Sequence, residues 1–426
     1  MAPKIKICLL LLSTICLIIS LPGCKTKRSL DAINVDSYNY DPYLILISLD
    51  GMRWDYVDRF KPPHLSNFIK KGVKAKSLIP SFPSKTFPNH YTIATGLYPD
   101  RHGLLGNNFY NHDKQVVYNI RDRNLVEDGS FYGGSPIWVE AHNAGMVTAS
   151  FFFVGTEADV KGVRPDYYFR FDGDIKNESR VEQALEWLSM PEEERPRMIT
   201  MYFSDMDNVG HRYGPNNDLV LGKTLFDLDE VLGQLFRGIE DIGLPVNVII
   251  VSDHGMADVP VDKYIPIEKI QNEELYNTID NGSIVNIHID DGNSIEDALS
   301  YLKSIEGPFN VYKTASTPYF EYKPENKDWG ELQVLPDEGF YFSSLRGINM
   351  RKKASWSVFG QHGYNPDIKD MHGIFYARGP AFKKDYTISS VKNIHVFPLM
   401  CKILGLEIPK DIDGDLKKIK KVLKDY

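Results

Sequence analysis

The sequence predicts an α/β fold in which a mostly parallel central sheet is covered by helices on both faces. Two observations support this prediction. Continuous apolar runs recur along the chain, beginning with Tyr43-Leu44-Ile45-Leu46-Ile47-Ser48-Leu49, and such runs are typical of parallel strands buried on both faces. Segments with the apolar periodicity of helices lie between the runs. Strand and helix therefore alternate, as they do in a parallel sheet with helical crossovers.

The later elements follow the same two patterns. Further apolar runs with the character of buried strands cover residues 147–154, 198–203 and 246–251. Apolar residues recur at helical spacing in residues 181–188 and 221–239. Near the C-terminus the pattern returns as a strand at 373–377 and a helix at about 391–404. The lysine-rich tail from 416 to 426 predicts an amphipathic surface helix, with an inward face made of Leu416, Ile419, Val422 and Leu423.

Between about residues 258 and 360 the alternation of strand and helix patterns stops. Proline, glycine and asparagine are frequent there, and a helix pattern at 294–305 lies among short strand patterns at 284–289 and 339–342. We interpret this region as a smaller α+β lobe inserted into the domain.

The N-terminal segment has the pattern of a secretory signal. Lys4 and Lys6 precede an apolar run, and the segment ends in Leu21-Pro22-Gly23-Cys24. This ending resembles the lipobox of bacterial lipoproteins, which predicts a signal peptide over residues 1–23, a lipidated Cys24 and a polar tether over 24–41. The domain would then be extracytoplasmic and anchored to a bacterial membrane, facing the periplasm or the cell exterior. The alternative is an ordinary cleaved signal with an incidental cysteine.

Composition narrows the class of protein. The net charge of −8 argues against a broad nucleic-acid-binding surface. After removal of the signal and lipidation of Cys24, Cys401 alone remains, so the mature chain has no internal disulfide. The fold must therefore be held by its hydrophobic core.

Thr86 lies at the start of a predicted helix. Pro88 fits the first turn of a helix and Gly96 fits its end, which places Thr86 at the N-cap. Free backbone N–H groups and the positive end of the helix dipole suit an anion such as phosphate. A threonine at such a position is also a common cap with no further role.

Acidic and imidazole side chains follow several of the strand-like runs. Functional groups collect at the carboxyl ends of parallel strands, and this chain places there Asp50, Asp207, His211, Asp253 and His254. His362 lies in a glycine-flanked segment further along the chain. Carboxylates and imidazoles together suit Zn²⁺, although the same ligands would accept other divalent ions.

These residues lie within motifs that resemble those of the nucleotide pyrophosphatase/phosphodiesterases of the alkaline phosphatase superfamily. The resemblance runs in order from about residue 43 to 405. Its motifs are Asp50-Gly51, Pro83-Ser84-Lys85-Thr86-Phe87-Pro88-Asn89-His90, Tyr98-Pro99-Asp100-Arg101-His102-Gly103-Leu104-Leu105-Gly106-Asn107, the segment 207–215, Ser252-Asp253-His254-Gly255-Met256 and Gly360-Gln361-His362-Gly363.

The resemblance implies an alkaline-phosphatase-like catalytic domain over 42–426 that holds two zinc ions. One ion would be held by Asp50, Asp253, His254 and the Thr86 oxygen, and the other by Asp207, His211 and His362. Thr86 would be the nucleophile of a two-metal hydrolase that cleaves phosphodiester and pyrophosphate bonds of nucleotides. A covalent Thr86 intermediate would then release a nucleoside 5′-monophosphate. Asn107 would donate to a phosphate oxygen.

Two aromatic residues match the family's nucleobase slot. Phe87 would pack on the base, and Tyr168 would form the opposite wall, with Tyr167 as the alternative. Within the superfamily the other candidates are a phosphomonoesterase and a phospholipid or choline phosphodiesterase. The segment 151–170 contains Lys161, Arg164 and Arg170 but no Lys–Arg pair of the monoesterase kind. A lipid-anchored binding protein without turnover is the non-enzyme alternative. The oligomeric state is left open by the sequence.

Overall fold

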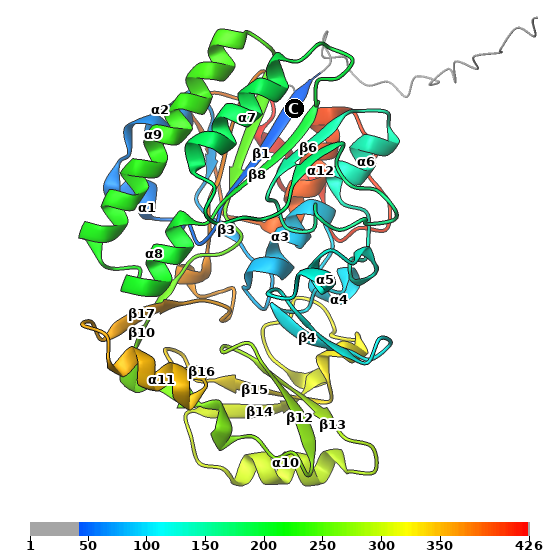
Figure 1. Ribbon diagram of the computed structural model, residues 1–426, viewed down its shortest axis with the longest axis vertical. Coiled ribbons are helices and arrows are strands. Elements are labelled where there is room, and N and C mark those ends of the chain that lie inside the picture. Colours follow the sequence, from blue (N-terminus) through cyan, green and yellow to red (C-terminus); the bar gives the residue numbers. More distant parts are fainter. Residues whose placement is uncertain (1–41, 425–426) are drawn as a thin grey trace, which may run out of the picture. The chain divides into compact units, whose positions relative to one another are not determined.

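The computed structural model describes residues 42–424, and its core is an eight-stranded sheet (Figure 1). The parallel strands β1 (Tyr43–Leu49), β8 (Met198–Phe203) and β9 (Val246–Val251) lie at its centre. Strand β18 (Phe375–Arg378) runs antiparallel to both of its neighbours, β9 and β2 (Val73–Ala75). The predicted, mostly parallel sheet is therefore confirmed. In spatial order the strands are β19 (Tyr386–Ile388), β2 (Val73–Ala75), β18 (Phe375–Arg378), β9 (Val246–Val251), β1 (Tyr43–Leu49), β8 (Met198–Phe203), β6 (Thr148–Phe151) and β7 (Tyr167–Phe169).

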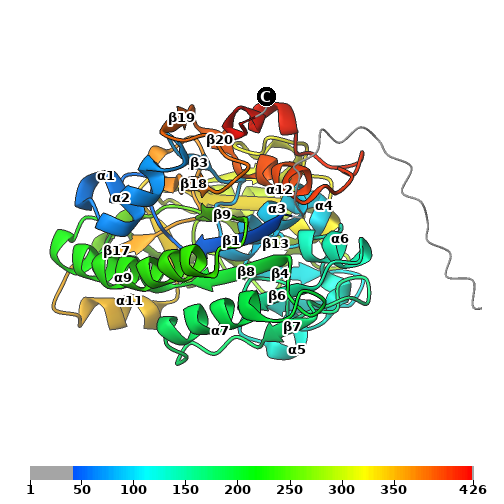
Figure 2. The ribbon, with the colours of Figure 1, turned by 90° about the horizontal axis from the view of Figure 1, so that it is seen from above.

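Helices cover both faces of the sheet, because successive side chains of its strands point to opposite sides. On β1, Leu44 and Leu46 belong to one hydrophobic core, whereas Ile45 and Ile47 belong to the other. The first core is closed by α3 (Thr86–Thr95), α6 (Ile137–Asn143) and α12 (Val396–Leu404). The second is closed by α1 (Tyr56–Phe60), α2 (Pro63–Lys70), α7 (Asn177–Ser189) and α9 (Asp218–Ile242). Figure 2 shows the sheet between these two layers.

The segment between residues 257 and 361 leaves the sheet and returns to it through a narrow neck. β10 (Ala257–Pro260) and β17 (Val358–Gln361) pair antiparallel, so the outgoing and returning chains lie side by side. A second strand pair joins β11 (Tyr264–Pro266) to β16 (Tyr341–Ser343). Beyond the neck lies a four-stranded antiparallel sheet in the order β12 (Tyr276–Asp280), β13 (Val285–Ile289), β15 (Leu332–Pro336) and β14 (Phe309–Lys313). Helix α10 (Ile295–Ser304) packs on it (Figure 1). We call residues 257–361 the inserted lobe.

The C-terminal tail differs from its prediction. It forms two short 3-10 turns, Leu416–Lys418 and Lys420–Val422, in place of one helix. The inward face was predicted better than the backbone, because Ile419, Val422 and Leu423 are all buried. Leu423 pairs with Phe382 in an isolated bridge, and a segment this short gains too little from helix formation to resist such pairing. The predicted helix at 391–404 is likewise shorter, because Val391–Lys392 form the strand β20.

No helix between residues 42 and 424 is both long and apolar enough to cross a membrane. The predicted signal peptide, tether and lipidated Cys24 lie outside the described residues.

Candidate metal-binding active site

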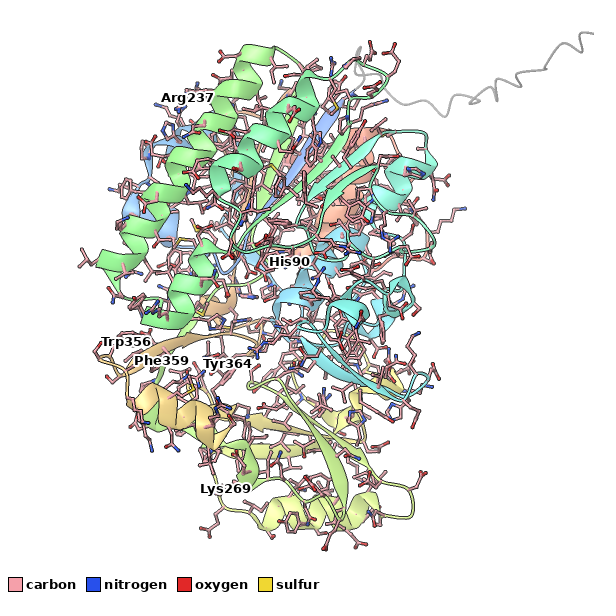
Figure 3. All side chains as sticks on the ribbon, viewed as in Figure 1. His90, Arg237, Lys269, Trp356, Phe359 and Tyr364 are labelled. Atoms are coloured by element: carbon pink, nitrogen blue, oxygen red, sulfur yellow. The ribbon has the colours of Figure 1, made fainter. Side chains whose placement is uncertain are left out.

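The predicted acidic and imidazole residues lie at one edge of the sheet. Asp50 directly follows β1, and Asp253 and His254 come two and three residues after the end of β9. Helix α8 (Asp205–Tyr213), which carries Asp207 and His211, begins just after β8. Because β1, β8 and β9 are adjacent and parallel, their carboxyl ends meet at the edge that faces the inserted lobe. His90 is labelled near this edge in Figure 3.

Helix α3 presents Thr86 to the same edge. Thr86 is the first helical residue, and the N-cap is Lys85, whose backbone is extended, so the predicted N-cap was wrong by one residue. The offset arises because Asn89 N–H donates to Lys85 O, which closes the first helical turn at Lys85. The predicted end of the helix is confirmed, with Gly96 in the left-handed region at φ 68°. The Thr86 hydroxyl oxygen lies 3.3 Å from His254 Nε2.

A first group of potential metal ligands consists of Asp50, Asp253 and His254. His254 Nε2 lies 2.9 Å from Asp253 Oδ2 and 3.5 Å from Asp50 Oδ1. All three side chains are buried. With Thr86, these are the residues that the resemblance assigns to one ion.

A second group lies beside the first and contains Asp207, His211 and His362. His211 Nε2 lies 3.3 Å from Asp207 Oδ1, and His362 Nε2 lies 4.0 Å from the same oxygen. The rings of His254 and His362 stack with their centres 3.5 Å apart. By ligand distance, Asp207 and His362 also group with His254. His254 therefore lies between the two positions, and the structure brings all seven predicted ligand residues together.

The neck of the inserted lobe explains how two of these histidines meet. Ala257, three residues after His254, pairs with Gln361, the residue before His362. The strand pair β10–β17 thus holds the two ends of the inserted lobe together and places one histidine on each side of the closure.

Each imidazole is oriented by a backbone carbonyl. The Nδ1 atoms of His211, His254 and His362 lie 2.8, 2.9 and 2.8 Å from the carbonyl oxygens of Gly360, Gly255 and Ser84. A carbonyl can only accept, so each Nδ1 carries the hydrogen and each Nε2 keeps its lone pair for a ligand. Metal-binding histidines are commonly fixed in this way.

The carboxylates fit a bound cation. One oxygen of each of Asp50, Asp207 and Asp253 is buried and has no hydrogen-bond partner. Burial, followed by repulsion from Asp253 and Asp207, raises the pKa of Asp50 well above its ordinary value. Burial also opposes ionisation of Asp253, but the neighbouring His254 and His90 outweigh it and hold the pKa of Asp253 well below the ordinary value. Buried carboxylates this close together need a positive partner, and carboxylate oxygens with imidazole nitrogens suit Zn²⁺.

Two supporting residues were missed from the sequence. Tyr202 donates from its hydroxyl to Asp50 Oδ2 at 2.6 Å. His90 lies 3.3 Å from Asp253 Oδ2 and 2.9 Å from the Thr86 carbonyl oxygen through Nδ1, and its Nε2 lies 2.7 Å from the Ser48 hydroxyl. The four-residue spacing from Thr86 puts His90 on the same face of α3, so its proximity could have been predicted.

Asn107 lies next to α3, the helix that carries Thr86. Its Oδ1 accepts a hydrogen bond from the Phe87 N–H at 3.1 Å. This contact turns the amide so that its NH₂ group is left to donate to a ligand.

The proposed aromatic walls are not in contact. Tyr168 lies on the edge strand β7 and is 37% exposed, while the Phe87 ring packs 6.4 Å from that of Tyr118. No ring contact between Tyr168 and Phe87 occurs. The Phe171 side chain is 43% exposed. The centre of its ring lies 6.1 Å from that of Tyr202, the residue that donates a hydrogen bond to Asp50. Phe171 follows β7 at the carboxyl edge of the sheet, so the rule that identified the acidic residues could have identified it too.

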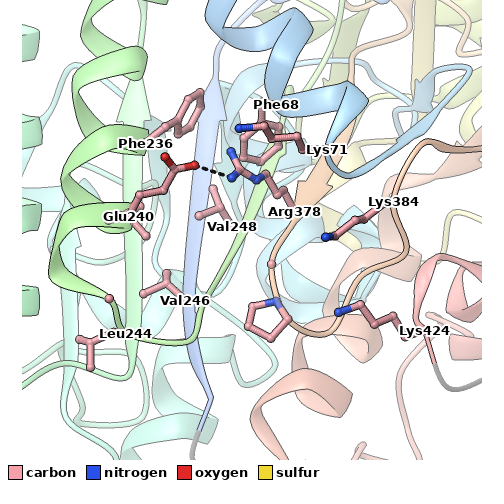
Figure 4. Close-up of a pocket in the computed structure, with 14 residues that line it drawn as sticks. Phe68, Lys71, Phe236, Glu240, Leu244, Val246, Val248, Arg378, Lys384 and Lys424 are labelled. Atoms are coloured by element: carbon pink, nitrogen blue, oxygen red, sulfur yellow. Dashed lines mark hydrogen bonds and ion pairs between the residues drawn. The ribbon is translucent and has the colours of Figure 1, made fainter.

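A separate hollow of about 370 Å³ lies at the amino end of β9 and contains none of the predicted site residues (Figure 4). Phe68 and Phe236 line it with several basic side chains, and Arg378 is paired with Glu240 across it. The candidate site is at the other end of the same strand.

Comparisons with known proteins identify the family of the chain. Residues 44–365 match the family model described as Type I phosphodiesterase / nucleotide pyrophosphatase. The chain is 31% identical over 368 residues to bis(5′-adenosyl)-triphosphatase enpp4 of Xenopus laevis, covering 86% of this chain and 78% of that protein. It is 29% identical over 407 residues to ectonucleotide pyrophosphatase/phosphodiesterase family member 1 of Mus musculus, covering 94% of this chain but 45% of that longer protein.

Solved structures give the same result. Murine ectonucleotide pyrophosphatase/phosphodiesterase 5 superposes with a TM-score of 0.81 and 27% identity, covering 89% of this chain and 100% of the other. An inactive threonine-to-alanine variant of that murine protein, in complex with AMP, superposes with the same TM-score and identity over 90% of this chain and all of the other. The fold is thus alkaline-phosphatase-like, as the resemblance implied. By sequence and by structure, the chain belongs to the Type I phosphodiesterase/nucleotide pyrophosphatase family.

Proposed function

We propose that the chain is a two-metal hydrolase that cleaves phosphodiester and pyrophosphate bonds in nucleotides and releases a nucleoside 5′-monophosphate. The observation that carries this proposal is the position of the Thr86 hydroxyl, at the start of α3 and 3.3 Å from His254 Nε2 within the seven-residue cluster. The names of the relatives support a nucleotide substrate, since one is a bis(5′-adenosyl)-triphosphatase and a structural neighbour binds AMP. That neighbour is inactive as a threonine-to-alanine variant.

The chemistry follows from the placement of the residues. Two zinc ions would be held by Asp50, Asp253, His254 and Thr86 on one side and by Asp207, His211 and His362 on the other. When bound, they supply Lewis-acid activation of the hydroxyl and charge stabilisation at the leaving oxygen. Thr86 loses its proton to solvent and its oxygen attacks phosphorus, while the bond to the leaving group breaks and the leaving oxygen takes up a proton from solvent. Water then attacks the same phosphorus and gives up a proton, and the bond from phosphorus to Thr86 breaks, which releases the monophosphate and leaves a proton on the Thr86 oxygen.

Other parts of the site would hold the phosphoryl group. Asn107 has its amide oriented by the Phe87 N–H and can donate to a phosphate oxygen. The first turn of α3 adds the positive end of its dipole. His90 lies on the same helix as Thr86 and its Nδ1 is 3.3 Å from Asp253 Oδ2, so it places this helix against the first group of ligands.

We extend the proposal to the nucleobase. Phe87 forms one wall of the slot, and Phe171 is a stronger candidate for the other wall than Tyr168, because Phe171 contacts Tyr202 beside the metal cluster. Base–aromatic stacking contributes about 1–3 kcal/mol. Phe171→Ala is therefore expected to raise KM for a nucleotide substrate more than Tyr168→Ala does.

A diester is favoured over a monoester by the partners of the nearby arginines. Arg170 pairs with Glu127 at 2.8 Å, and Arg164 donates to the Glu157 carbonyl at 2.9 Å and lies 3.8 Å from Asp159. These guanidinium groups already have partners, which leaves no basic pair here for the additional charge of a monoester.

A substrate panel tests the proposal. Purified protein of measured metal content is assayed with p-nitrophenyl-TMP, p-nitrophenyl phosphate and p-nitrophenylphosphorylcholine, with Thr86→Ala as the control. We expect p-nitrophenyl-TMP to be cleaved fastest and the control to lose at least about 10³-fold in kcat. Faster cleavage of the monoester would refute the diesterase assignment. Turnover equal to that of Thr86→Ala would favour a binding protein.

We also propose that the mature protein is extracytoplasmic and lipid-anchored through Cys24. The lipobox-like sequence Leu21-Pro22-Gly23-Cys24 supports this. Cys24→Ser is expected to move the protein from the membrane fraction to the soluble fraction, and unchanged fractionation would contradict the anchor.

A further inference from the structure

A second pair of histidines, away from the active site, joins two parts of the chain. His112 directly follows β4 (Asn108–Asn111), the first strand of a hairpin completed by β5 (Val116–Asn119). His288 lies on β13 of the inserted lobe. The two ring centres are 5.1 Å apart and the ring planes are tilted by 47°.

This arrangement repeats that of two histidines in the candidate active site. The rings of His211 and His362 are also 5.1 Å apart and are tilted by 55°. Two imidazoles that share one tetrahedral Zn²⁺ at about 2.1 Å per nitrogen place their ring centres roughly 5 Å apart. The separation of His112 and His288 therefore allows both to ligate one ion.

The polar atoms of the pair support this assignment. His288 is 4% exposed, yet neither of its ring nitrogens has a hydrogen-bond partner. The same condition marks the carboxylate oxygens of the active-site cluster. A buried imidazole whose two ring nitrogens have no partner is costly unless a ligand satisfies it.

His112 is oriented as a metal ligand would be. Its Nδ1 lies 3.0 Å from Asp328 Oδ1, and the buried Asp328 also accepts from His112 N at 2.9 Å and from Asn111 Nδ2 at 2.8 Å. A carboxylate on Nδ1 leaves the Nε2 lone pair available and strengthens it as a donor. Both histidines line a cavity of about 460 Å³ that also has Tyr110 and Asn277 on its wall.

We propose that His112 and His288 bind a divalent transition-metal ion, with Zn²⁺ as the expected ion, at a site separate from the catalytic cluster. Water in the cavity would complete the coordination. The ion would link the β4–β5 hairpin to the inserted lobe. Asn108 and Asn281 already join these two parts at the other end of β4, through hydrogen bonds of 3.0 and 2.8 Å. Because Asn107 directly precedes β4, the ion would brace the segment that carries the phosphate-binding amide.

Equilibrium dialysis against buffered free Zn²⁺ tests the site. The variants are His112→Gln and His288→Gln, and the matched control is His64→Gln, because the side chains of His64 and His112 are both 27% exposed and each has one carboxylate partner. We expect the wild type and His64→Gln to bind one more ion per chain than either site variant.

The alternative is that the two rings simply pack together, as His288 does with Tyr110 at 5.3 Å. Equal Zn²⁺ uptake by His112→Gln and His64→Gln at every free concentration would establish that alternative and overturn the proposal. If His288→Gln does not fold, the comparison of His112→Gln with His64→Gln decides the question.

Discussion

The two groups of candidate metal ligands lie on different structural elements. Asp50 and Asp253 follow neighbouring strands of the central sheet and are 1% exposed. Asp207 and His211 lie on α8, and His362 follows the strand that returns from the inserted lobe. The His211 side chain is 35% exposed, whereas that of His254 is fully buried. The first group is therefore fixed by the register of the sheet, while the second also depends on the position of the lobe.

The largest effect on activity is expected from a change in the first group, whose carboxylates follow strands of the central sheet. Asp253→Asn removes the charge that faces His254 and His90 and leaves a neutral amide where a buried anion was. We expect loss of the first ion and a fall in kcat/KM of at least about 10³-fold that added Zn²⁺ does not restore. Metal analysis and steady-state kinetics measure both quantities. Recovery of kcat/KM at high Zn²⁺ would contradict the view that the strands of the sheet alone fix the first group.

A smaller effect is expected from His211→Gln. Water can reach this more exposed position and replace the imidazole, so we expect at least about a 10-fold loss of activity that added Zn²⁺ partly restores. Activity measured against free Zn²⁺ distinguishes the two groups. A loss as large and as irreversible as that of Asp253→Asn would erase the distinction.

The stability of the core beneath α3 is expected to depend on pH through the buried His102. His102 packs against Tyr91 and lies 3.0 Å from the Thr92 hydroxyl, both on α3, and burial lowers its pKa from 6.5 to about 3. Between pH 6.5 and pH 3, His102 therefore binds a proton in the unfolded chain but not in the folded chain. Its contribution to the free energy of unfolding is fully present above pH 6.5 and is lost as the pH falls toward 3. For this one group the loss is about 2 kcal/mol between pH 7 and pH 5.

Urea unfolding at these two pH values measures the loss. His102→Gln is expected to be less stable at pH 7 but to show a smaller difference between pH 7 and pH 5. An unchanged difference would show that His102 is not the group responsible.

The smallest effect is expected from a contact that links the lobe to the second group. Lys85 Nζ lies 2.8 Å from the Tyr341 hydroxyl and donates to the His362 carbonyl at 2.9 Å. Tyr341→Phe removes the hydroxyl that accepts from Lys85. We expect the Zn²⁺ affinity of the second group to fall by at most about 10-fold and that of the first group to stay unchanged. Zn²⁺ titration of the activity measures it, and weaker binding at both positions would argue against a lobe-specific role.

Local patterns explain how much was predictable from the sequence. Apolar runs such as 246–251 and the acidic residues that follow them are signals within a few residues, and the sheet and the clustering of the seven ligand residues could be predicted from them and the family resemblance. The reversed direction of β18 depends on its pairing with the distant strand β9, and the failure of the tail to form one helix depends on the bridge from Leu423 to Phe382. The approach of His112 to His288 depends on how the lobe meets the hairpin. No periodicity in the sequence records such contacts.

The pairing of Ala257 with Gln361 has a consequence for how the protein matures. His254 precedes this strand pair and His362 follows it. The two rings can therefore stack only after the inserted lobe has brought its two ends together. A newly made chain whose inserted lobe has not yet folded would therefore not have His362 beside His254, even if its central sheet were complete. Under the proposed function, hydrolytic activity would therefore depend on closure of the inserted lobe as well as on formation of the central sheet.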